Sequence, residues 1–88
     1  MKAINPIKAG LALGVVIALI HASWALIVAA GLAQRLVDII FWLHFVQPLY
    51  VILPFDIATA LMLVGMAAVC GFVVGLVFAV VWNRFHLS

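Results

Sequence analysis

The sequence predicts an all-α membrane protein: an antiparallel two-helix transmembrane hairpin with a short interfacial helix in the connecting loop. Of the 88 residues, 72% are hydrophobic and only 7% are charged, whereas about a quarter of the residues of a soluble domain are charged. The apolar residues form two long runs, and the segment between them holds both acidic residues. Each run also has small residues at every fourth position, which places them on one helix face. We therefore expect a single membrane domain with lipid as its solvent.

The first predicted span covers residues 6–33. Asn5 is a suitable N-cap, and Pro6 suits the first helical turn because its missing N–H has no role there. A helix of this length extends about 42 Å, which exceeds the roughly 30 Å hydrocarbon core and allows tilt. A cleaved signal peptide is the alternative, since Gly31-Leu32-Ala33 resembles a cleavage site. The apolar stretch is longer than a usual signal core, which favours a retained span.

The last predicted span covers residues 57–82. Asp56 precedes it as the expected N-cap, where its charge also favours the positive end of the helix. Trp82 and Arg84 at the far end are expected to anchor the helix in the interface. The span extends about 39 Å and is also long enough to cross a bilayer.

The connecting segment is predicted to hold an interfacial helix over residues 35–46, followed by a loop over residues 47–55. The helix is about 18 Å long, too short to span, and its polar and apolar residues separate onto two sides. Trp42 and Tyr50 are expected at headgroup depth as aromatic anchors. The alternative is a third span over residues 37–53, which would place polar side chains in the hydrocarbon.

The two small-residue ladders are expected to pack against each other inside the hairpin. Helices in lipid associate through close packing at small residues, since no hydrophobic force draws them together. Residues at equal depth in an antiparallel pair have a nearly constant sum of residue numbers, and a sum of 89 matches every rung. The alternative sends one ladder to a second copy and gives a homo-oligomer. The predicted pairs are Gly10 with Ala79, Gly14 with Gly75, Ala18 with Gly71 and Ala22 with Ala67.

His21 is predicted near the bilayer midplane, where an ionisable group suggests a function. The first expectation is a neutral imidazole bonded to a carbonyl of its own helix or to a polar group of a partner. The alternative is an axial ligand to haem or to a chlorophyll-type pigment, completed by His21 of a second copy. A proton relay would need more titratable groups in the spans, and the sequence has none.

The sequence does not predict an enzyme. It has no carboxylate pair within the spans, no Gly-rich phosphate loop, and no cysteine or histidine cluster with the spacing of a metal site. The net charge of +2 comes from too few basic residues for a nucleic-acid surface. Neither a catalytic residue, a metal nor a nucleic-acid partner is expected.

Three short motifs carry a resemblance: Asn5-Pro6-Ile7-Lys8, Pro54-Phe55-Asp56 and Trp82-Asn83-Arg84. With them the chain resembles small two-span inner-membrane proteins of bacteria that have no assigned function. The resemblance implies the bacterial inner (cytoplasmic) membrane but no activity. Because basic residues flank the outer ends of both spans, we expect both termini to be cytoplasmic.

The expected function is that of a structural or accessory subunit that packs against a larger membrane complex. This follows from the absence of reactive groups and of a soluble domain. The first alternative is a self-associating pore or holin-like protein, although holins usually have a charged tail that this chain lacks. The second is a haem- or pigment-binding subunit that uses His21.

Overall fold

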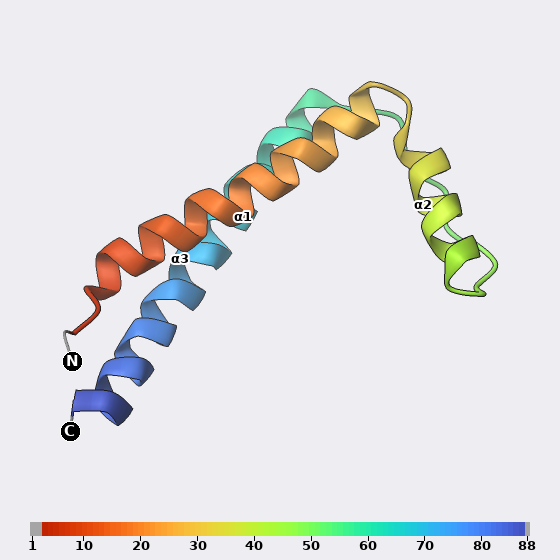
Figure 1. Cartoon of the computed structure of the whole chain (residues 1–88). Helices are drawn as coiled ribbons and strands as arrows, with labels where there is room; N and C mark the ends of the chain where they lie inside the picture. Colours follow the sequence, from red (N-terminus) through yellow and green to blue (C-terminus); the bar gives the residue numbers. More distant parts are fainter. Residues whose placement is uncertain (1–2, 88) are drawn as a thin grey trace.

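A computed structural model describes residues 3–87, and the described chain consists of three helices without strands. Helix α1 covers Pro6–Ala29, α2 covers Ala33–Leu43 and α3 covers Ile57–Leu87. Figure 1 shows α1 and α3 side by side, with the start of α1 and the end of α3 at the same end. At the other end α2 turns away from both long helices, and the chain returns beside it. The all-α class predicted from the sequence is confirmed.

Helix α1 begins at its predicted cap, since the Asn5 side-chain oxygen accepts hydrogen bonds from the N–H groups of Ile7 (3.0 Å) and Lys8 (3.2 Å). It ends four residues before the predicted residue 33. Gly31 has a φ of +78°, and this left-handed turn closes the helix. The neighbours of Gly31 are apolar, so hydrophobicity alone does not mark the end.

Helix α2 starts two residues earlier and ends three residues earlier than the predicted range of 35–46. The helix ends before Phe45, whose φ of +62° is a backbone conformation that residues other than glycine rarely adopt. The N–H of Phe45 donates to the Trp42 carbonyl (3.1 Å), and the N–H of Val46 donates to the Phe41 carbonyl (2.9 Å). These are the two hydrogen bonds of a Schellman motif. A phenylalanine in the position usually held by glycine gave no signal in the sequence.

Helix α3 continues five residues past the predicted residue 82. The rings of Trp82 and His86 stack with their centroids 3.7 Å apart, and His86 Nδ1 lies 3.0 Å from the Trp82 carbonyl. These contacts hold the last turn as helix, whereas the polar residues there suggested an end. The predicted cap at the other terminus is confirmed, because Asp56 accepts hydrogen bonds from the Thr59 N–H (2.9 Å) and hydroxyl (2.7 Å).

Only small residues are buried where α1 meets α3. Nearly all large apolar side chains of both helices are at least partly exposed, for example Leu26 with 70% and Leu61 with 66% of the side chain accessible. By length and composition, Pro6–Ala29 and Ile57–His86 are both apolar enough to cross a membrane. The buried residues of the two helices are Gly10, Gly14, Ala67, Gly71, Gly75 and Ala79.

The predicted register of the two ladders is wrong by one helical turn. A Cβ atom built on Gly71 would lie 2.8 Å from the Gly14 Cα, and one on Gly75 would lie 2.9 Å from the Gly10 Cα. Gly10 therefore faces Gly75 and Gly14 faces Gly71, which corresponds to a sum of 85 instead of 89. None of the four predicted pairs, Gly10–Ala79, Gly14–Gly75, Ala18–Gly71 and Ala22–Ala67, forms at the predicted level. Ala18 and Ala22 are half-buried.

One physical cause favours the observed register. It sets glycine against glycine at two rungs, whereas the predicted register does so at one, and glycine allows the closest approach of two backbones. In addition, the Asn83 amide accepts from the Ile4 N–H (2.8 Å) and donates to the Ile4 carbonyl (2.7 Å). The residue numbers of this pair sum to 87, between the two registers, so the Asn83 bonds join the helix ends without selecting either register.

Candidate functional site

His21 is half-buried and bonded within its own helix. Its Nδ1 lies 2.8 Å from the Ile17 carbonyl, so Nδ1 is the donor of this hydrogen bond. His44 and His86 make the same contact with the carbonyl four residues before them. Because α1 ends early, His21 lies about 5 Å from the midpoint of the helix. The imidazole is therefore hydrogen-bonded to a carbonyl of its own helix, as the first expectation held.

His21 belongs to no cluster of metal-ligating side chains in the described part of the chain. Among residues 3–87, no three histidine, cysteine or acidic side chains gather to hold a metal ion. His21 also lines neither the cleft at the start of α3 nor the cleft beside α2.

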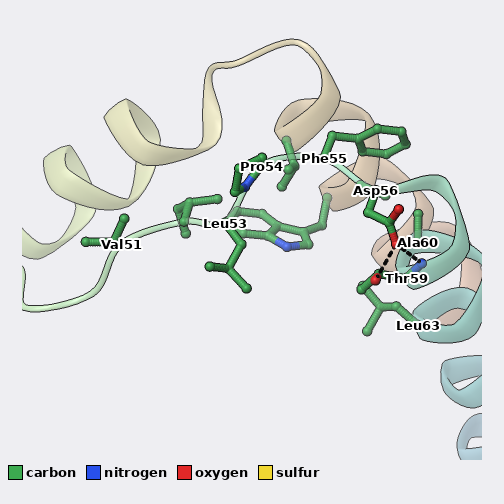
Figure 2. A pocket seen from close by; sticks show the side chains of 12 residues that line it. Val51, Leu53, Pro54, Phe55, Asp56, Thr59, Ala60 and Leu63 are labelled. Atoms are coloured by element: carbon green, nitrogen blue, oxygen red, sulfur yellow. Dashed lines mark hydrogen bonds between the residues drawn. The ribbon is translucent and has the colours of Figure 1, made fainter.

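A cleft of about 250 Å³, here called the loop-end cleft, lies where the return segment 51–55 passes the end of α1 and the start of α3. Figure 2 shows this segment on one side of the cleft and the first two turns of α3 on the other. The lining is mainly apolar. It includes Trp24 and Val28 of α1, Ile52 and Pro54 of the return segment, and Ala60 and Leu63 of α3.

Asp56 contributes the one carboxylate of the loop-end cleft. The hydrogen bonds from the Thr59 hydroxyl and N–H hold the pKa of Asp56 below its usual value. A lowered pKa means that the folded chain favours the charged form. The hydrogen bonds from Thr59 to Asp56 therefore stabilise the fold at pH values above the ordinary pKa of an aspartate. This stabilisation is lost as the pH falls through the lowered pKa of Asp56. The sequence predicted the cap but not the cleft beside it.

Gln34 connects α2 to the return segment, a role that sequence reasoning missed. Its side-chain oxygen accepts from the Ile52 N–H (2.6 Å), and its amide nitrogen donates to the Tyr50 carbonyl (3.1 Å) and to the Asp38 carboxylate (2.9 Å). One side chain thus satisfies two backbone groups of a segment that has no strand partner. The only signal in the sequence was an amide side chain at the start of the connecting segment.

The polar side of α2 borders a second, more open cleft of about 660 Å³. Gln34, Arg35 and Asp38 line it together with Trp42, which is 74% exposed. The polar residues predicted to share one side of the connecting helix therefore do lie along one surface. Because the cleft is wide and open, it has the character of a helix surface more than of an enclosed site.

The four predicted anchor residues lie at the two ends of the long helices. Trp42 and Tyr50 are exposed at the α2 end, and the Tyr50 ring lies 6.1 Å from that of Phe41. Trp82 is half-buried at the other end, and Arg84 is exposed beside it.

Comparisons with protein-family models, with curated proteins and with solved structures found no match to this chain.

Proposed function

We propose that this chain is a two-span membrane protein that serves as an accessory subunit packed against a larger membrane complex. The observation that carries the proposal is the distribution of side-chain size. The contact between α1 and α3 uses small residues, so nearly all the large apolar side chains remain on the outside. Such a surface is stable in lipid and is suited to packing against other transmembrane helices.

The outer faces favour a subunit over the alternative of a pore. A water-filled channel needs a polar lining. Ser23 is one of the few polar side chains on the outer face of α1, and its hydroxyl donates to the Leu19 carbonyl (2.9 Å) within the same helix. An oligomer of this hairpin would therefore present mainly apolar surface to any central channel.

The orientation in the proposal follows from charge. Lys8 and Arg84 lie near the start of α1 and the end of α3, at one end of the pair, whereas both acidic residues lie toward the other end. By the positive-inside tendency, both termini face the cytoplasm and α2 lies in the outer interface. The resemblance in the sequence makes the bacterial inner membrane the proposed location.

Blue-native electrophoresis of membranes solubilised in mild detergent tests the proposal. We expect the tagged chain to resist carbonate extraction and to migrate with one complex much larger than itself. A pure homo-oligomer that causes ion leakage in vesicles would instead support the pore.

Two sets of alanine substitutions would locate the partner face. Met62, Met66 and Val69 are exposed on α3, and Leu19 and Leu26 are exposed on α1. Alanine keeps these faces apolar, so insertion should persist. Because one face is expected to carry most of the contact, one set should abolish co-migration while the other serves as its control.

A further inference from the structure

The loop-end cleft combines an apolar interior with a charged rim. Trp24 and Val28 of α1 and Leu63 of α3 supply apolar lining, and the Asp56 carboxylate lies where α3 begins. Figure 2 shows Asp56 on the α3 side of the cleft, turned toward Thr59. A ligand that fills this cleft therefore needs an apolar part and a polar part.

The charge of Asp56 has no cationic partner in the described chain. Both hydrogen bonds from Thr59 reach Oδ2. No basic side chain is among the residues that line the loop-end cleft, and Arg35 lines the other cleft. The unpaired negative charge is complementary to a cationic group on the ligand.

The positions along α3 match the depth profile of a lipid. Leu63 follows Asp56 by seven residues, which is about 10 Å along a helix. If α3 crosses the bilayer, as the proposed function holds, Asp56 lies at headgroup depth and Leu63 lies among the acyl chains. Trp24 enters the same cleft from α1 and has the amphipathic character common at this boundary.

We propose that the loop-end cleft binds a phospholipid with a primary-ammonium headgroup, such as phosphatidylethanolamine. The ammonium group pairs with Asp56, and the upper part of one acyl chain lies against Trp24 and Leu63. This inference rests on the two-span arrangement of the proposed function but not on any partner complex.

Lipid retention by the purified full chain tests this proposal. The chain is reconstituted with equal amounts of phosphatidylethanolamine and phosphatidylglycerol, and the lipids that remain bound in mild detergent are counted by native mass spectrometry. We expect a preference of about two- to fivefold for phosphatidylethanolamine, since exposed ion pairs contribute modestly. Asp56→Asn should remove this preference while keeping the helix cap, because asparagine caps as well as aspartate.

Asp38→Asn is the matched control, because Asp38 is the other acidic residue and lines the other cleft. It should leave the preference unchanged. Ala60→Phe, which fills the cleft, should reduce the retention of both lipids, with circular dichroism as the check on folding. Equal retention of the two lipids by the unmodified chain would overturn the proposal, and so would an unchanged preference in Asp56→Asn. The experiment contains only the purified chain and lipid. A negative result would therefore count against the lipid site but not against co-migration with a larger complex.

Discussion

Replacement of Gly75 by alanine should destabilise the packing of α1 against α3 by about 1–3 kcal/mol, the usual cost of overpacking. The added methyl would lie 2.6 Å from the Ala9 carbonyl oxygen and 2.9 Å from the Gly10 Cα. Both are backbone atoms, so the helices must separate to make room. Denaturation of the purified chain in mixed detergent micelles, followed by tryptophan fluorescence, measures the change. Gly71→Ala should behave alike, since its methyl would lie 2.8 Å from the Gly14 Cα.

Gly65→Ala is the matched control in the same helix. Apart from its chain neighbours and the backbone of its own helix turn, no atom lies within 4 Å of a Cβ built on Gly65. Alanine is the better helix former by up to about 1 kcal/mol, so this variant should be neutral or more stable. If Gly65→Ala and Gly75→Ala had equal effects, the observed register of the two helices would be wrong.

Gln34→Ala should release the return segment from α2. The substitution removes hydrogen bonds to Ile52, Tyr50 and Asp38, and each net contribution is about 0.5–1.5 kcal/mol. We expect the local opening free energy to fall by about 2–3 kcal/mol. Amide hydrogen exchange at Ile52 measures this directly, because its N–H is the donor to Gln34. Stability of the contact between α1 and α3 should hardly change.

Gln47→Ala makes the same chemical change at an exposed position between α2 and the return segment. Exchange at Ile52 should remain slow in this variant. Equal acceleration by both substitutions would show that the segment opens independently of the Gln34 hydrogen bonds.

The sequence predicted the features of the fold that depend on local chemistry. Asn5 and Asp56 cap the helices as expected, since both side chains act within four residues of their own positions. The end of α1 was misplaced because Gly31 was its only marker within an apolar run. The register was misjudged because small residues at every fourth position fit several alignments one turn apart. The close approach of Gly71 to Gly14 and of Gly75 to Gly10 distinguishes between these, and it joins residues far apart in the sequence.

The candidate site was less predictable for the same reason. The residue type and depth of His21 suggested a function, yet its ring bonds to the carbonyl four residues before it, as those of His44 and His86 do. The roles of Gln34 and Asp56 depend on where the return segment lies in space. No periodicity in residues 44–56 indicates that path, so the sequence predicts neither the hydrogen bonds of Gln34 to the return segment nor the loop-end cleft.

The central claim, that the two long helices cross a bilayer, can be tested at Cys70, the only cysteine of the chain. Cys70 is exposed in the folded chain and lies about 20 Å along α3 from its first residue. A membrane-impermeant maleimide applied to intact cells should leave Cys70 unlabelled until the membrane is dissolved and the protein denatured. Leu49→Cys in a Cys70→Ala background should react at once, since Leu49 is 83% exposed beyond the helices. Rapid labelling of Cys70 in intact cells, at the rate of Leu49→Cys, would contradict the claim.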